Sequence, residues 1–433
     1  MKRILPLLLF ALAAAPAFAT WVPTADSTTG SPKFTDGNFV IKWNTNNKQL
    51  SYVSHDSSVS TVCDMTTFSE DVDAVSGYSH PTSVAGSGFA GKSGITRVIL
   101  PEACVGINQQ SFSSMADLES VVISSQTRIS GKQSFSSNGR LATITPHGMA
   151  ETNGVVFFPA TVTSIPSNAF QGQNAAALKH VIAPGATDFG GDACFTGCSG
   201  LETVTVKDLK HIYQLMFQGC SALTNVCVLS RKSPFSGIES FPNGDRQFQS
   251  CSAWTQPIDF SAATFTYLQP QMFYGADRVS EFRLPATLTS IGKQALRSDS
   301  CAIQRRIWFY GPPPTFYYSS TDADYCLWGP ANVRQVVFVP EQYAVAWTNA
   351  LSQDGATFST ITDSDRARSD YPTKLTDVKA KAVGPRFDLV PTRVKDADVL
   401  GVTNGRSRWN NAGRPYYVVQ WREVPQGTLI VVK

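Results

Sequence analysis

The sequence is poor in charged residues and in histidine, which limits the chemistry it can support. Only 16% of its 433 residues are charged, and five are histidines. No two histidines have the His-x-x-x-His spacing of a metal-binding helix, and no Gly-x-Ser-x-Gly nucleophile elbow occurs. We expect the glycine-rich segment 85–91 to be a loop and not a phosphate site, because no helix pattern follows it. The sequence therefore predicts a protein that is not an enzyme and that holds no metal and no cofactor.

Long apolar runs are also absent after the first twenty residues. No later stretch approaches ~18 uninterrupted apolar residues, so we expect no membrane span. At the N-terminus, Lys2 and Arg3 precede a short apolar run, and Ala17-Phe18-Ala19 has the small-x-small form of a cleavage site. These features predict a signal peptide over residues 1–19. The predicted location is the bacterial periplasm, the cell surface or the medium.

The charge is unevenly distributed, although the net charge of +3 is small. From Arg366 onward there are thirteen Lys and Arg against six Asp and Glu, so the preceding body is weakly acidic. Two interpretations of this basic tail remain open. It is either an ordinary solvated surface or an element that attaches to an anionic cell surface or polysaccharide.

A repeat of about 23 residues occupies the middle of the chain. Phenylalanine recurs as Phe170, Phe195 and Phe217, at intervals of 25 and 22 residues. Leucine follows it with a similar step, as Leu178, Leu201 and Leu223. Weaker copies extend both ways, which places the array over residues 93–345, with insertions where the phenylalanine interval lengthens to 35 and to 31. Because so short a unit cannot bury its own apolar face, successive copies must stack.

Each copy contains a strand pattern with two distinct faces. In the segment 201–206, Val204 and Val206 point one way while Thr203 and Thr205 point the other. The valines build the core, and the opposite face is the candidate ligand-binding surface. By this alternation the face carries Arg97, Ser120, His180, Thr203, Thr205, Asn225, Cys227, Glu281 and Arg283.

Nine cysteines in an exported chain suggest disulfides, but their spacing favours another role. Cys198, Cys220 and Cys251 occupy one repeat position, shortly after the recurring phenylalanine. A buried ladder of free thiols explains this, since free cysteine behaves as a small apolar residue. A disulfide between neighbouring copies and a zinc site around Cys194 and Cys198 remain alternatives.

The repeat resembles the leucine-rich repeats of the BspA-like surface-antigen family. The segments that carry the resemblance are 159–165, 285–292, 197–201 and 219–223. The sequences 307–311 and 336–340 also look like the end of such an array. The resemblance implies a curved, right-handed, strand-rich solenoid with short helical turns. Departures from the pattern occur at Gln173-Asn174, in place of Gly-Cys, and at Leu296, in place of phenylalanine.

Two flanking segments complete the predicted layout. Residues 20–92 form a β-rich cap, in which 39–43 and 49–53 pair as strands. Solenoid ends expose apolar surface, so a cap is needed there. Residues 346–433 form a basic, β-rich tail with strands over 415–421 and 428–433.

The predicted function is that of an exported or cell-surface binding protein. Family members include adhesins, so the resemblance implies a protein or polysaccharide ligand held on the solenoid face. We expect a monomer that binds no nucleic acid. The alternative is a structural component of the envelope or matrix attached through its basic tail. An exported hydrolase is the most remote possibility.

Overall fold

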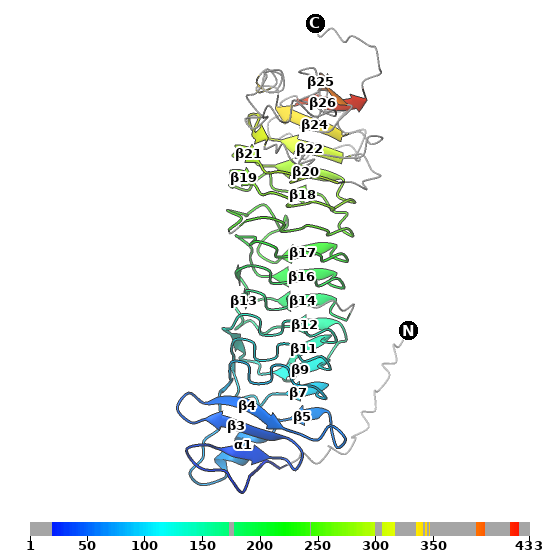
Figure 1. Ribbon diagram of the computed structural model, residues 1–433. Helices are drawn as coiled ribbons and strands as arrows, with labels where there is room; N and C mark the ends of the chain where they lie inside the picture. The colour runs from blue at the N-terminus through cyan, green and yellow to red at the C-terminus, as the bar shows by residue number, and fades with distance from the viewer. Residues whose placement is uncertain are drawn as a thin grey trace, which may run out of the picture.

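The computed structural model shows a column of stacked coils (Figure 1). It describes residues 20–172, 177–242, 244–298, 305–316 and 335–340, the single residues 343 and 346, and the segments 387–394 and 416–423. The predicted signal peptide (1–19), the departure at Gln173-Asn174, the strand expected at 428–433 and most of the tail lie outside the described residues.

The longest row of strands runs along one side of the column. Its eight parallel strands are, in spatial order, β5 (Val62–Asp64), β7 (Arg97–Ile99), β9 (Ser120–Ile123), β11 (Thr143–Pro146), β12 (Val155–Phe157), β14 (His180–Ala183), β16 (Thr203–Val206) and β17 (Asn225–Val228). A separate sheet continues this side with β18 (Ile258–Asp259), β20 (Glu281–Leu284), β22 (Arg305–Phe309), β24 (Gln335–Pro340), β26 (Tyr416–Glu423) and β25 (Phe387–Val394). The last two strands are antiparallel and follow β24 at the end of the stack.

A second row of shorter strands lies on another side of the coils. Its first sheet contains β1 (Val22–Pro23), β2 (Lys33–Thr35), β3 (Val40–Asn44), β4 (Gln49–Ser54), β6 (Ser83–Val84), β8 (Gly106–Ile107) and β10 (Arg128–Ile129). Two smaller sheets follow, made of β13 (Ser164–Pro166) with β15 (Asp188–Gly190), and of β19 (Tyr267–Leu268), β21 (Ser290–Ile291) and β23 (Thr315–Phe316).

A third side contains turns, yet it is also joined from coil to coil by backbone hydrogen bonds. Around Phe195, the N–H groups of Ala193, Phe195 and Gly197 donate to carbonyls of the next coil at 2.9, 2.9 and 2.7 Å. Ala193 and Gly197 have φ of 56° and 78°, in the left-handed region that L-residues rarely adopt. A positive φ recurs two residues before the equivalent anchor position of nine coils, at Ser87, Gln110, Gln133, Asn168, Ala193, Leu215, Arg246, Gln271 and Gln294.

The recurring phenylalanines form one continuous stack inside the column. They are Phe89, Phe112, Phe135, Phe170, Phe195, Phe217, Phe248 and Phe273, and all are buried. Neighbouring ring centroids lie 5.1 to 5.7 Å apart, with interplanar angles of 21° or less. This spacing suits parallel-offset aromatic contact. Leu296 takes the same place in the next coil, and it too is buried.

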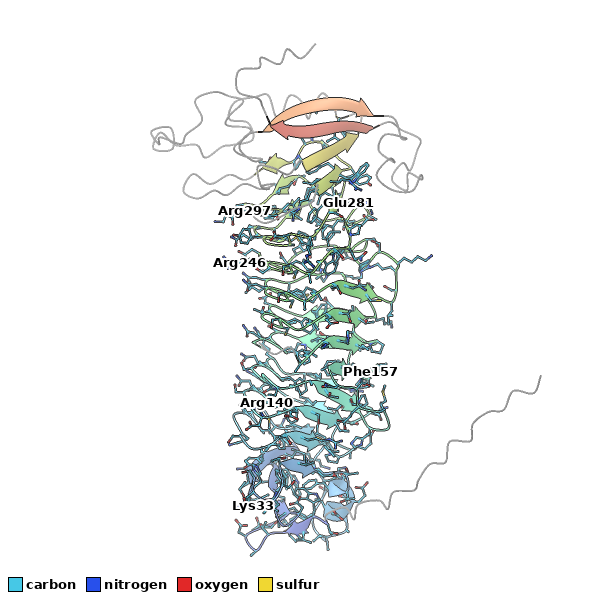
Figure 2. The ribbon with its side chains drawn as sticks, turned by 90° about the vertical axis from the view of Figure 1, so that its right-hand side faces the viewer. Lys33, Arg140, Phe157, Arg246, Glu281 and Arg297 are labelled. Atoms are coloured by element: carbon cyan, nitrogen blue, oxygen red, sulfur yellow. The ribbon has the colours of Figure 1, made fainter. Side chains whose placement is uncertain are left out.

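The leucine-rich-repeat solenoid predicted from the sequence is confirmed, but two of its details differ. Among the described residues up to 316 there is one helix, α1 (Phe68–Asp73), which lies in the first coil between β5 and β7, and the later coils have turns where short helical turns were expected. The column is also straight in two perpendicular views, where a curved array was expected (Figures 1 and 2). Both differences have one cause. The turn side and the strand sides are each linked by backbone hydrogen bonds, so all sides advance equally, by about 4.8 Å per coil.

The N-terminal end of the column is closed by an antiparallel meander. The predicted hairpin is confirmed, since β3 and β4 pair across residues 44–49. Beneath it, Trp21, Phe34, Trp43 and Phe68 pack with centroid separations of 4.9 to 6.3 Å. The coils begin before residue 93, because β5 already pairs with β7 and Phe89 is the first ring of the stack.

The phenylalanine stack should dominate stability. We expect Phe195→Ala to lower the free energy of unfolding by about 3–5 kcal/mol, because it leaves a cavity between two coils. Phe195→Leu should cost much less, since leucine occupies this place at position 296. Guanidinium denaturation followed by circular dichroism measures both. A cost below about 1 kcal/mol for the alanine variant would show that the coils do not depend on the stack.

Candidate ligand-binding face

The outer face of the long strand row displays most of the residues predicted from the sequence. Val181, Val204 and Val226 point inward and are buried, so their neighbours point outward. Strand register aligns five of the predicted residues in one outer line, although β11 and β12 interrupt it: Arg97, Ser120, His180, Thr203 and Asn225. Thr205 and Cys227 lie in a second line beside it.

Over β14, β16 and β17 the side chains of the first line are uncharged, and two of them lie within hydrogen-bond distance of each other. His180 Nδ1 lies 2.9 Å from the hydroxyl of Thr203 on the next strand. Asn225, at the end of the row, is exposed. This part of the face therefore offers amide, imidazole and hydroxyl groups to a ligand rather than a stripe of charge.

The first insertion covers the N-terminal part of this face, which the sequence did not predict. Residues 147–154, which we call the strap, connect the adjacent parallel strands β11 and β12 and cross back over the outside of the sheet. Glu151 forms an ion pair with Arg97, and the hydroxyl of Thr143 donates to the carbonyl of Thr152 at 3.3 Å. His147 Nε2 lies 2.6 Å from the carbonyl oxygen of Leu100. Arg97 thus holds the strap.

The strand row breaks between β17 and β18, and the break has a local cause. Trp254 occupies the position that Leu201 and Leu223 hold in the two preceding coils, and its indole N–H donates to the carbonyl of Gln256 at 2.9 Å. Pro257 follows directly before β18 and lacks the N–H that a continuing ladder requires. The two strands consequently belong to separate sheets.

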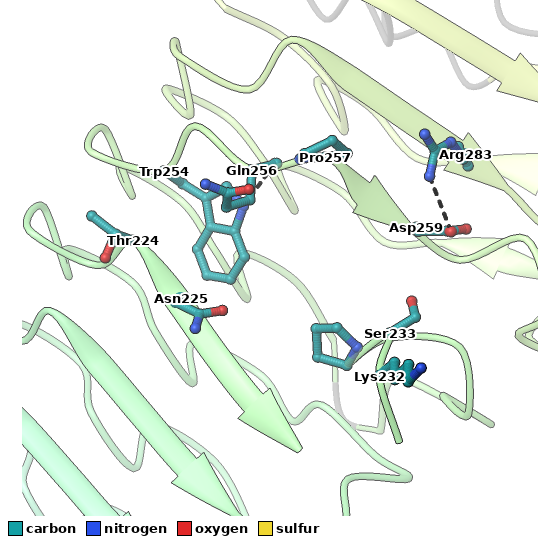
Figure 3. A pocket seen from close by; sticks show the side chains of 10 residues that line it. Thr224, Asn225, Lys232, Ser233, Trp254, Gln256, Pro257, Asp259 and Arg283 are labelled. Atoms are coloured by element: carbon teal, nitrogen blue, oxygen red, sulfur yellow. Dashed lines mark hydrogen bonds and ion pairs between the residues drawn. The ribbon is translucent and has the colours of Figure 1, made fainter. Parts of the chain in front are cut away.

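A pocket of about 640 Å³ occupies this break (Figure 3). Ten residues line it: Thr224, Asn225, Lys232, Ser233, Pro234, Trp254, Gln256, Pro257, Asp259 and Arg283. Asn225 and Arg283, predicted from separate strands, are thereby brought to one site. Arg283 Nη1 donates to Asp259 at 3.1 Å, while the exposed Lys232 pairs with no carboxylate among the described residues. Within that part of the chain, the pocket thus combines a neutralised floor with an unpaired cation at its edge.

The expectation that Glu281 and Arg283 are exposed is wrong. Their exposed fractions are 5% and 7%. Arg283 pairs with Asp259 on β18 and with Glu281 on its own strand, and Glu281 also lies 3.4 Å from Arg306 on β22. Because these opposite charges neutralise one another across three strands, they pack together instead of extending into water. Only Arg283 of this pair reaches the pocket.

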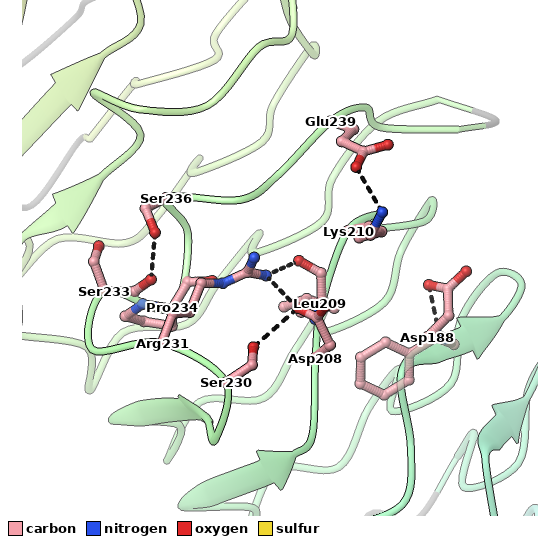
Figure 4. Close-up of polar contacts among 11 residues, drawn as sticks. Asp188, Asp208, Leu209, Lys210, Ser230, Arg231, Ser233, Pro234, Ser236 and Glu239 are labelled. Carbon is pink, nitrogen blue, oxygen red and sulfur yellow. Dashed lines mark hydrogen bonds and ion pairs between the residues drawn. The ribbon is translucent and has the colours of Figure 1, made fainter.

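The second insertion supplies one wall of the pocket and is fixed by Arg231 (Figure 4). Its guanidinium donates to the carbonyl of Leu209, to Asp208 at 3.1 Å and to the carbonyl of Pro234 at 3.2 Å. A side chain at Gly237 would collide with it, because an added Cβ would lie 1.6 Å from Nη1. Lys232, Ser233 and Pro234 are therefore presented by a braced loop.

The cysteine ladder lies inside the column and not on the binding face. Cys198, Cys220 and Cys251 are buried, free thiols. Each Sγ donates to the carbonyl oxygen of the phenylalanine in the preceding coil, at 3.1 to 3.2 Å. Burial raises the pKa of the Cys220 thiol well above its usual value, and that of Cys251 as well. They remain protonated donors at neutral pH.

The glycine-rich loop has a feature that the sequence interpretation overlooked. Gly86–Ser93 satisfies the letters of a nucleotide-binding loop, Gly-x-x-x-x-Gly-Lys-Ser. In the structure, however, every backbone N–H from Ser87 to Lys92 donates to a backbone carbonyl, and Phe89 is buried in the aromatic stack. A bend and the strand β7 follow the segment, not a helix. These six N–H groups are therefore not available to cradle a phosphate.

The described residues contain no group of three or more His, Cys, Asp or Glu placed to hold a metal ion. In the same part of the chain, no helix has the length and apolar character needed to cross a bilayer.

The repeat geometry and the sequence match identify the family. A model of the BspA type leucine rich repeat region matches residues 45–157, 150–243 and 242–307, with six copies. The chain belongs to the BspA-type leucine-rich-repeat family. No curated protein sequence matches the chain.

Two solved structures illustrate what the chain is similar to. A leucine-rich repeat protein from Bacteroides ovatus is 14% identical, with 63% of this chain and 94% of that chain covered and a TM-score of 0.25. A leucine rich cell surface protein from Faecalibacterium prausnitzii is 17% identical, with 64% and 88% covered and a TM-score of 0.28. Similarity at this level identifies no ligand.

The pocket residues Lys232, Trp254 and Asp259 were missed by sequence reasoning, although a signal for them existed. The interval of 31 residues between Phe217 and Phe248 marked an insertion. A tryptophan at the leucine position, followed by proline, marked the break in the ladder.

Site-resolved thiol alkylation tests the cysteine ladder. In the native protein at pH 8, iodoacetamide should modify the partly exposed Cys227 first, and Cys198, Cys220 and Cys251 about a hundredfold more slowly, since their reaction requires local opening. Mass spectrometry of tryptic peptides measures each rate. After denaturation without reductant, all nine cysteines should react. Any pair that stays unmodified would instead be a disulfide.

Proposed function

We propose that this family member is a non-enzymatic, exported binding protein that holds a protein or glycan ligand on the outer face of its strand row. The pocket at the break between β17 and β18 is the centre of the proposed site. We place the protein at the cell surface or outside the cell, in an adhesin-like role. Membership of the BspA-type family supports this proposal.

The observation that carries the proposal is the way polar groups gather where the ladder is interrupted. Elsewhere in the column the backbone groups bond to neighbouring coils. At the break, Asn225, Lys232 and Gln256 extend exposed side chains around a concavity with Trp254 in its wall. A concave site with a few convergent polar groups is a usual ligand-binding arrangement.

The alternative is an envelope or matrix component attached through the basic C-terminal tail. The positive charge after Arg366 supports it. Deleting residues 366–433 would separate the two functions only imperfectly, because β26 in that segment pairs with β24 of the column. Neutralising Lys374, Lys379 and Lys381 to Gln leaves both terminal strands unchanged and is the cleaner variant. Loss of surface retention with unchanged ligand binding would favour attachment by the tail.

Binding to a glycan array and to a panel of purified extracellular-matrix proteins tests the proposed site. For any ligand found, the double variant Asn225→Ala/Lys232→Ala should bind about tenfold or more weakly, because it removes an amide and the cation at the edge of the pocket. The matched control is Asn46→Ala/Lys132→Ala, which removes the same groups from exposed positions in the cap and outside the pocket. Equal affinities of the wild type and the pocket variant would place the site elsewhere.

A further inference from the structure

The second outward line of the strand row is apolar over much of its length. After Asp64 on β5 it contains Ile99 and Val122, passes Thr145, and continues through Phe157 and Ile182 to Thr205. These side chains face away from the core, because the buried Val156, Val181 and Val204 occupy the alternate positions. A contiguous apolar patch on an outward face commonly marks an interaction surface.

The strap covers the first half of this line. Beneath it, Ile99 and Val122 have exposed fractions of only 9% and 8%, although both point outward. The strap is an irregular segment of the same chain, tied down by Glu151, His147 and Thr152 through the contacts described above. The strap is therefore a segment of polypeptide, with turns at both ends, that is seated on this face.

The second half of the line has no such cover. Phe157 and Ile182 pair with each other across β12 and β14, Val155 lies beside them on the outer face, and all three are partly exposed. Together these three residues, which we call the apolar patch, continue the apolar surface beyond the strap.

We propose that the apolar patch is a docking site for an extended segment of a partner protein, which would lie beside the strap as the strap lies on Ile99 and Val122. This inference rests on the proposed binding function and narrows its ligand to a protein. Val155 and Phe157 project from alternate residues of one strand, about 6.6 Å apart. An extended segment running along the strand presents its own alternate side chains at the same spacing. The partner segment therefore carries apolar residues at positions i and i+2.

The chemistry of the patch favours a polypeptide over a glycan. Glycans are held largely through hydrogen bonds, and the polar side chains beside Phe157 and Ile182 in their own line are Thr145, which is buried, and Thr205, which offers a single hydroxyl. The backbone groups of β12 and β14 are directed along the ladder. Burial of apolar side chains is the main gain available here.

The test is selection from a phage-displayed library of peptides about ten residues long on the full-length protein. Selected peptides should show apolar residues at i and i+2. Binding of a synthetic selected peptide, measured by fluorescence anisotropy, should weaken about tenfold or more in Phe157→Thr/Ile182→Thr. Threonine is chosen because Thr145 and Thr205 already hold this line, so the strands keep their pairing. The control Val59→Thr/Leu229→Thr, at exposed apolar positions outside the patch, should bind normally.

Three results would overturn the inference. The first is a library that yields no peptide with this pattern, and the second is equal peptide binding by wild type and the threonine variant. The third is a dimer of the wild type, seen by sedimentation, that the threonine variant loses, since a second copy would then be the occupant. The proposed function stands or falls separately, on the glycan and matrix-protein panel and the pocket variants. A melting temperature of the threonine variant within a few degrees of wild type confirms its fold.

Discussion

Every coil depends on the backbone hydrogen bonds that join it to its neighbours around the buried phenylalanine. Three N–H groups per coil, at the phenylalanine and two residues to either side, donate along the column axis. To direct them this way, the chain accepts left-handed φ at residues such as Gln110, Leu215 and Arg246, which have ordinary side chains. Such conformations cost of order 1–2 kcal/mol per residue and persist only where surrounding contacts enforce them. The stacked rings and the inter-coil bonds supply those contacts together.

This regularity explains why the candidate sites occur where the repeat is interrupted. A coil that obeys the pattern uses its backbone groups internally and offers only short outward side chains. The first insertion adds β12 to the long row without adding a ring to the stack, so its connection must return over the outer face as the strap. After the second insertion, Trp254 and Pro257 prevent β18 from joining β17, and the resulting gap is the pocket. Departures from the repeat thus create individual surfaces on a uniform scaffold.

The spacing of phenylalanine and leucine was enough to predict the solenoid and the inward and outward faces of its strands. Curvature could not be predicted in this way, because it depends on how the turn side is bonded between coils. The course of the strap could not be predicted from the sequence for a similar reason. The interval between Phe135 and Phe170 reveals extra residues but not the direction in which they cross. Strand alternation wrongly predicted that Glu281 and Arg283 are exposed. Charge pairing across strands, rather than strand periodicity, decides their burial.

The cysteine position illustrates how structure refines an interpretation based on size and polarity. A small apolar residue would fit between coils, yet Asn138, at the equivalent position of an earlier coil, is also buried. Its amide donates to the carbonyl of Phe112 at 2.7 Å, as each cysteine thiol donates to the phenylalanine carbonyl of the coil before it. Cysteine and asparagine differ in polarity but share this donor. Met115 and Ala276 occupy the same position but have no such donor, so a donor is common at this position without being required. What recurs at this position is therefore a small buried group that can satisfy a carbonyl left beside the aromatic stack.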